Sequence, residues 1–217
     1  MRGKRVRALA FAGALVTWSG LVAPRIPPRW QVPLHAAVSA GLFASTRAPL
    51  GLGPPAGWRG LRLGSATATV VFVAVTATSR LPRVHAAMAA RELPEHTSGW
   101  LLVRIPVGTV WSEEAAFRGA LGTVAAAAFG PRWGRVLQAS AFGLSHLADA
   151  RSAGQSVAGT VLVTGAAGWV FAWLYERSGS LLAPMLTHLA SNESGAVAAV
   201  LVQRAAGRQT SRMSACS

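Results

Sequence analysis

The apolar stretch from Trp100 to Phe129 contains ionisable residues that could do chemistry. They are Arg104, Glu113, Glu114 and Arg118. If this stretch crosses a membrane, each such group near the bilayer centre costs about 2.5–3.5 kcal/mol on insertion scales. Four of them in one segment therefore require a structural or chemical reason.

Helical geometry separates the two glutamates. Glu114 and Arg118 are four residues apart on one helix face, with the acid toward the N-terminus, which is the favourable order for an ion pair. Glu113 lies about 100° around the helix from Glu114 and does not share Arg118 equally. We therefore expect a buried structural pair, Glu114–Arg118, and a free Glu113 carboxylate suited to general-base chemistry. The alternative is that both glutamates are interfacial and solvated.

Two further polar positions lie on later helical segments. His146 follows Phe142 by four residues, and Asn192 follows His188 by four, so each pair projects from one helix face. His188 and Asn192 can thus offer a ring nitrogen and an amide to one point in a cavity. Taken singly, His146 is more typical of a packed core histidine, and the His188–Asn192 pair also fits hydrogen bonding between helices.

The composition indicates that these residues belong to a membrane protein. Of 217 residues, 52% are hydrophobic and only 13% are charged, whereas a soluble domain usually carries about 25% charged residues. The net charge of +14 invites a nucleic-acid interpretation. However, the arginines fall in short gaps between apolar runs, as in membrane-protein loops beside anionic lipid headgroups. We therefore expect a lipid bilayer as a partner and no nucleic acid.

Seven segments are candidates for crossing a bilayer, which requires about 20 apolar residues for each helix. They are roughly Ala8–Ala23, Trp30–Thr46, Leu63–Ser79, Trp100–Phe129, Gly134–Ala150, Ser156–Tyr175 and Ser180–Val202. The fourth is long enough to be broken or kinked at Pro106. The sequence thus predicts an all-α fold, a polytopic transmembrane bundle of about seven to eight helices. The positive-inside rule favours a cytoplasmic N-terminus.

Three motifs in order resemble those of the CAAX protease and bacteriocin-processing family. Ser112 to Gly119 resembles its Glu-Glu-x-x-x-Arg motif, Phe142 to His146 its Phe-x-x-x-His motif, and His188 to Asn192 its His-x-x-x-Asn motif. The run from Ser178 to Pro184 is also similar to the family's usual lead-in to the third motif. The resemblance covers about residues 100–200. It divides the chain into N-terminal membrane helices (1–97), a catalytic helical core (98–203) and a basic, disordered tail (204–217).

The resemblance implies an intramembrane endopeptidase that hydrolyses a peptide bond near the membrane surface. Glu113 and His146 would activate water, and His188 and Asn192 would donate hydrogen bonds to the oxyanion. Glu114, Arg118 and Phe142 would support them. The implied partner is a peptide or protein substrate, and the implied location is a bacterial cell membrane that the chain crosses several times.

Three alternatives remain beside metal-free glutamate chemistry, the mechanism that we favour. Glu113, His146 and His188 could bind Zn²⁺ with water in the fourth position, although His-Glu-x-x-His is missing and Asn is an uncommon zinc ligand. The chain could also be a non-catalytic membrane scaffold or immunity protein with the same fold. A small transporter is disfavoured because no duplicated halves are visible.

Overall fold

The computed structural model describes residues 2–215, which form helices and contain no β-strand. The predicted all-α fold class is therefore confirmed for this part of the chain. Three of the elements labelled η are π-helical (η1, η3, η4) and η2 is a 3₁₀ helix. In chain order the elements are α1 (Arg2–Thr17), η1 (Trp18–Val22), η2 (Ala23–Arg25), α2 (Pro28–Thr46), α3 (Ala56–Thr78), α4 (Pro82–Ala90), α5 (Thr97–Gly99), η3 (Trp100–Trp111), η4 (Glu114–Leu121), α6 (Gly122–Ser145), α7 (Leu147–Ser152), α8 (Val157–Ser178) and α9 (Leu182–Ala215).

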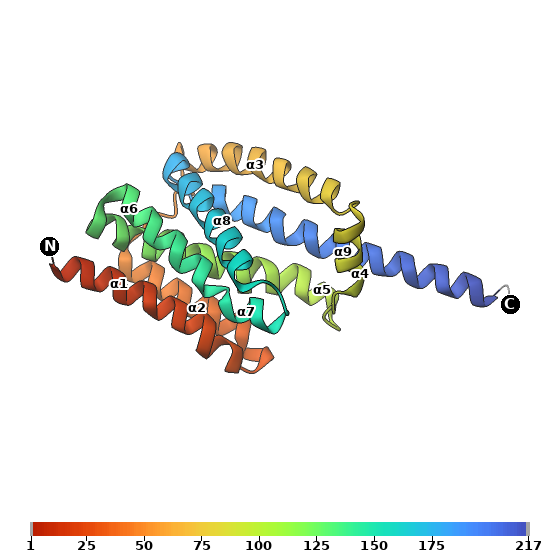
Figure 1. Cartoon of the computed structure of the whole chain (residues 1–217). Helices are drawn as coiled ribbons and strands as arrows, with labels where there is room; N and C mark the ends of the chain where they lie inside the picture. The colour runs from red at the N-terminus through yellow and green to blue at the C-terminus, as the bar shows by residue number, and fades with distance from the viewer. Residues whose placement is uncertain (1, 216–217) are drawn as a thin grey trace.

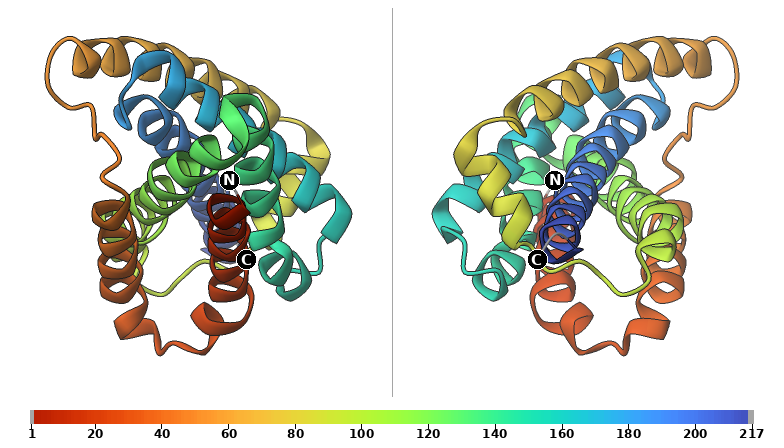
Figure 2. Two further views of the ribbon diagram at one scale, coloured as in Figure 1. Left: turned by 90° about the vertical axis from the view of Figure 1, so that its left-hand side faces the viewer. Right: turned by 90° about the vertical axis from the view of Figure 1, so that its right-hand side faces the viewer.

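The helices form one bundle, with α3 on one side and α1 and α2 on the other (Figure 1). The main packing partners are α3 with α9, α6 with α8, and α1 with α6, while α2 packs along η3 and η4. Figure 2 shows the same arrangement from the two ends, with α3 remaining opposite α1 and α2. The segments that carry the predicted motifs, η3 to η4, α6 and α9, thus belong to one packed unit.

Several polar and charged side chains are fully buried while many large apolar side chains are exposed. Glu114, Arg118 and Gln138 are at most 1% exposed, whereas Val70 and Leu102 are 68% and 76% exposed. Charged residues are almost never fully buried in soluble proteins unless they are paired. An apolar exterior of this kind matches the hydrocarbon core of a bilayer.

Three stretches are long and apolar enough to cross a membrane: Arg2–Arg25, Ala56–Thr78 and Val157–Ser178. They overlap the first, third and sixth predicted segments, which supports a location in the membrane. The finer prediction, that seven or eight helices cross, stays a prediction, and so does the orientation of the N-terminus.

The long fourth segment is continuous through Pro106. The chain runs as a π-helix from Trp100 to Trp111 and again from Glu114 to Leu121, with Pro106 inside the first of these. A π-helix bonds i to i+5, is rare, and is frequently found at functional sites. The predicted break at Pro106 does not occur, and the helical backbone is instead interrupted after the end of this segment. Gly130, at φ 80° and ψ 165°, interrupts α6 directly before Pro131, and its positive φ suits a residue without a Cβ atom.

Close packing of α6 against α8 depends on glycine. A Cβ atom on Gly143 would lie 2.5 Å from the carbonyl oxygen of Val161, and one on Gly168 would lie 2.7 Å from Cδ1 of Phe142. Small residues at such crossings let two membrane helices approach closely. Gly143 and Gly168 therefore fix the position of the α6 segment that carries the second motif.

The turn between α8 and α9 is held by the linker that joins α2 to α3. Gly179 ends α8 in the left-handed conformation. Leu181 N donates to the Leu50 carbonyl at 3.0 Å, and Tyr175 Oη donates to the Pro49 carbonyl at 2.6 Å. This turn is the lead-in run before the third motif. It sets where α9 begins.

Helix α9 continues to Ala215, which is beyond the predicted end of the seventh segment. It thus includes much of the basic tail, residues 204–217, for which disorder is predicted. Residues 216 and 217 lie outside the described residues. Disorder of residues 204–217 stays a prediction.

Candidate active site

Glu114, Arg118 and His188 form a buried polar group inside the bundle. Glu114 and Arg118 lie one turn apart on η4, with Glu114 Oε2 2.8 Å from Arg118 Nε. His188 comes from α9 and donates from Nδ1 to Glu114 Oε1 at 2.7 Å. All three side chains are buried. One oxygen of the Glu114 carboxylate thus accepts a hydrogen bond from His188 and the other forms an ion pair with Arg118, so the η4 and α9 segments are tied together.

Aromatic rings surround this polar group. The guanidinium carbon of Arg118 lies 4.0 Å from the ring centroid of Phe142 and 5.0 Å from that of Phe171, which is close enough for cation–π attraction. The His188 ring stacks on Phe171 at 5.0 Å. Phe142 also contacts the His146 ring edge to face at 4.8 Å. The ring of Phe142 therefore links the second motif to the buried charges.

Glu113 lies between η3 and η4 and has surroundings different from those of Glu114. Its side chain is 26% exposed, and its Oε2 lies 3.9 Å from His188 Nε2. That oxygen is buried and accepts no hydrogen bond from any residue in the described part of the chain. A buried polar atom without a partner calls for a water or a ligand. The partly exposed Glu113 carboxylate therefore differs from the fully buried, ion-paired Glu114.

His146 is fixed by its own backbone. It caps α6 at φ −91° and ψ 4°, and Nδ1 lies 2.8 Å from the Phe142 carbonyl oxygen. Because a carbonyl oxygen can only accept, Nδ1 carries a proton, and in the neutral imidazole the lone pair is therefore on Nε2. The fifth predicted segment, Gly134–Ala150, is therefore wrong at its end. Helix α6 stops before His146, and α7 begins after it.

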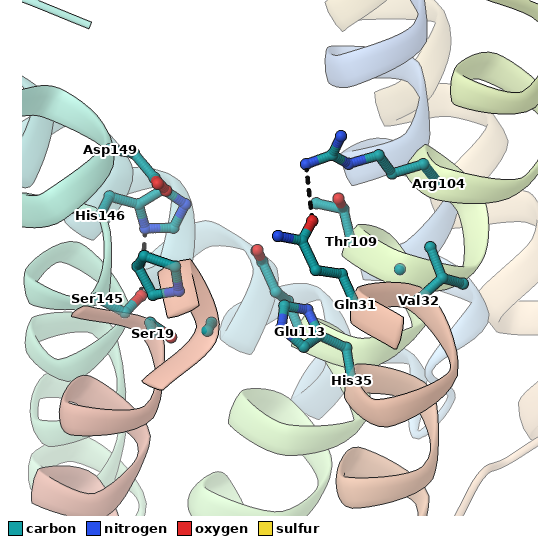
Figure 3. Close-up of a pocket in the computed structure, with 13 residues that line it drawn as sticks. Ser19, Gln31, Val32, His35, Arg104, Thr109, Glu113, Ser145, His146 and Asp149 are labelled. Carbon is teal, nitrogen blue, oxygen red and sulfur yellow. Dashed lines mark hydrogen bonds between the residues drawn. The ribbon is translucent and has the colours of Figure 1, made fainter. Parts of the chain in front are cut away.

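Glu113 and His146 both line a cavity of about 240 Å³. Figure 3 shows His146 and Asp149 on one wall, Gln31 and Arg104 on the opposite wall, and Glu113 and His35 between them. His188 and Asn192 are described residues but do not line this cavity. His188 reaches it only through the neighbouring Glu113, and Asn192 lies half-buried one turn further along α9. Glu113 and His146 thus share one cavity, His188 lies beside Glu113, and Asn192 is outside the cavity lining.

Six polar residues of the cavity belong to no predicted motif: Ser19, Gln31, His35, Arg104, Thr109 and Asp149. Nε2 of His35 is buried and has no hydrogen-bond partner among the described residues. Gln31 and His35 are four apart in an apolar segment, the same signal that singled out His188 and Asn192, so they could have been found from sequence. Asp149 lies in α7, in the connection between α6 and α8. Burial raises the pKa of its carboxyl group, and nearby His146 opposes this shift.

The zinc alternative requires Glu113, His146 and His188 to converge on one ion. Among the described residues, no group of three or more His, Cys, Asp or Glu side chains is arranged to hold a metal ion. Because His188 Nδ1 donates to Glu114, Nε2 is the only nitrogen of that ring that could bind a metal ion. The donor set expected for zinc is therefore not assembled in this arrangement.

One comparison with known proteins bears on the identity of the chain. Residues 95–193 match the family model described as type II CAAX prenyl endopeptidase Rce1-like. The matched region includes η3, η4, α6 and the part of α9 that carries His188 and Asn192, and so spans all three motifs. No curated protein and no solved structure matches the chain. Residues 95–193 thus match the Rce1-like CAAX endopeptidase family, which agrees with the family that the three motifs predicted.

Proposed function

We propose that the chain is an intramembrane endopeptidase that hydrolyses a peptide bond near the membrane surface, using water activated by Glu113 and His146. One observation carries this proposal. The unpartnered Oε2 of Glu113 and the ring of His146, with its lone pair on Nε2, belong to the same cavity. A carboxylate and a neutral imidazole are the two groups most used as general bases.

The reaction needs one proton to be moved twice. A water held between Glu113 and His146 gives up a proton to one of them as its oxygen attacks the substrate carbonyl carbon. The same group then returns the proton to the amine nitrogen that leaves, so the enzyme regains its starting state. The bond from His146 Nδ1 to the Phe142 carbonyl leaves Nε2 as the ring atom that can take up the proton and return it.

The oxyanion role of His188 requires a particular protonation state. Because Nδ1 already donates to Glu114, His188 can donate to an oxyanion only from Nε2, and only when both nitrogens carry protons. The buried Glu114 carboxylate supports that positive charge. Asn192, one turn along α9, would supply the second donor. Preorganised donors of this kind contribute about 10²–10³-fold each to the rate of acyl transfer.

The test is a comparison of membranes from cells that express the wild-type chain, Glu113→Gln or Glu95→Gln. Glu95→Gln is the matched control, because Glu95 is exposed in the linker before α5. Mass spectrometry of protein C-termini should find cleaved products with the wild type and Glu95→Gln, and intact precursors with Glu113→Gln. We expect a loss of at least about 10²-fold in rate, as for removal of a general base.

Identical C-termini in the Glu113→Gln and wild-type membranes, at equal protein levels, would defeat the peptidase proposal and favour the scaffold. Activity of purified protein in the presence of a chelator tests the metal alternative. We expect that activity to persist, whereas its loss, with restoration by zinc, would establish the zinc-dependent enzyme.

A further inference from the structure

A second, smaller cavity adjoins the active-site cavity at Glu113. It has a volume of about 60 Å³, and its lining comes from α1, η1, α2, η3 and η4. Four residues line both cavities: Ser19, His35, Gly108 and Glu113. Because Gly108 has no side chain, the side chains at the boundary between the two cavities are those of the other three.

His35 brings an unpartnered nitrogen to this boundary. Its Nε2 atom is buried and has no hydrogen-bond partner among the described residues. The ring packs edge to face against Trp18, with the ring centroids 5.8 Å apart. Figure 3 shows His35 together with Glu113 between the two walls of the large cavity. The imidazole is therefore held by packing, and its Nε2 remains able to bond a small molecule.

Glu113 brings an oxygen in the same condition. Its Oε2 is buried, lies 3.9 Å from His188 Nε2, and has no hydrogen-bond partner in the described part of the chain. The side chain as a whole is 26% exposed, so the rest of the carboxylate is more accessible than this oxygen. Since neither atom has a partner, no hydrogen bond joins His35 Nε2 to Glu113 Oε2 directly. A molecule that bonds to both atoms would satisfy both.

Water fits the small cavity in size and in chemistry. A buried water needs about 10–15 Å³ and two to four polar partners. The small cavity exceeds this volume, and the side chains of Ser39 and Ser112 join His35 and Glu113 in its lining. A water can donate to the carboxylate and can either donate to or accept from Nε2, so it suits both tautomers of His35. Ligand pockets for larger molecules have volumes of about 300–1,000 Å³, so the small cavity excludes a peptide.

We propose that His35 holds a buried water against Oε2 of Glu113 and thereby orients the carboxylate that acts as general base. This inference rests on the proposed peptidase function. It adds a positioning residue from α2, outside residues 95–193, which match the family model. The reacting water is a different one, shared by Glu113 and His146 in the large cavity. A carboxylate fixed at Oε2 keeps its other oxygen directed at that reacting water.

The first test measures kcat and KM with a synthetic peptide that spans one site identified in the membrane comparison above. His35→Leu removes the bond to the buried water and should lower kcat about 10- to 100-fold, the range for a hydrogen bond to a charged group. KM should stay within about twofold, because the small cavity is separate from the one that takes the peptide. His85→Leu, at an exposed position on α4, is the matched control and should behave like the wild type.

Two polar replacements separate orientation of Glu113 from general packing. The amide nitrogen of His35→Gln can reach the place of the imidazole Nε2, whereas the shorter side chain of His35→Asn cannot. We therefore expect His35→Gln to keep most of the wild-type kcat and His35→Asn to lose it, at similar unfolding temperatures in detergent micelles. Equal kcat values for these two variants would overturn the inference, even if His35→Leu fails to fold.

The effect should also depend on Glu113. In a Glu113→Gln background, His35→Leu should cause little further loss of the residual rate, because no carboxylate remains to be oriented. A full additional loss would show that His35 acts apart from Glu113 and would overturn the inference. An unchanged kcat in His35→Leu, beside cleavage that does depend on Glu113, would also overturn it and leave the peptidase proposal intact. Absence of any Glu113-dependent cleavage would defeat both.

Discussion

Two adjacent glutamates have different surroundings because only one of them is fully buried. Glu114 is buried and held by Arg118 and His188, whereas Glu113 is partly exposed and lines the cavity. A paired, buried carboxylate stabilises its neighbours and is unavailable to a substrate. At the scale of single residues, the ion pair of Glu114 with Arg118 is therefore expected to stabilise the fold rather than to act on a substrate.

Removing only one member of this buried pair should be strongly destabilising. Arg118→Leu leaves the Glu114 carboxylate without its counter-charge, and breaking a buried pair costs about 3–5 kcal/mol. The double variant Glu114→Gln/Arg118→Leu removes both charges and should recover much of that loss, although not the support of His188. Denaturant unfolding in detergent micelles measures the two free energies, with Arg83→Leu as an exposed control. Equal stability of the single and double variants would show that the pair is not coupled.

At the scale of helices, the active site depends on how closely α6 approaches α8. Phe142 and His146 come from the last turn of α6 and the residue after it, and the Gly143 backbone lies directly against α8. Any increase in the separation of these helices moves His146 relative to Glu113, which is carried by a different helix. Small residues at the crossing are thus part of the catalytic geometry.

Gly143→Ala should separate the two helices. The new Cβ atom would lie 2.5 Å from the Val161 carbonyl oxygen, and overpacking of this kind costs about 1–3 kcal/mol. We expect a lower unfolding temperature and a reduced kcat. Gly195→Ala in α9 is the matched control, because nothing lies within 4 Å of its Cβ position and alanine favours a helix by up to about 1 kcal/mol. Similar effects of the two substitutions would contradict this account of the crossing.

At the scale of the whole molecule, the apolar exterior determines which solvent the fold tolerates. Val70 lies near the middle of α3 and is 68% exposed. On a soluble protein, a polar residue at such a position changes stability by less than about 0.5 kcal/mol. In hydrocarbon, an aspartate costs about 2.5–3.5 kcal/mol. The same substitution therefore distinguishes the two environments.

Val70→Asp should reduce the amount of the chain that inserts into membranes, whereas Val70→Ala should not. The measurement is the fraction of each variant that remains in the membrane pellet after a carbonate wash, relative to the total made. If the aspartate variant inserts as well as the alanine variant, α3 does not face lipid at this position.

The sequence alone was sufficient for the all-helical fold, the location in a membrane and the family. These properties depend on composition and on spacings of four residues within one helix, which are local. The ion pair of Glu114 with Arg118 follows from the same rule. Gln31 and His35 also have this four-residue spacing, but they match none of the three motifs and so are not among the predicted site residues.

Properties that depend on distant segments or on an unusual backbone were decided by the tertiary structure. The π-helix moves Arg104 to the side of Glu113, which ordinary helical spacing places on opposite faces. The end of α6 at Ser145 leaves His146 at a cap, and the donation from His188 to Glu114 joins residues that are 74 positions apart. Spacing within one helix does not predict such contacts, because the packing of helices against one another determines which side chains meet.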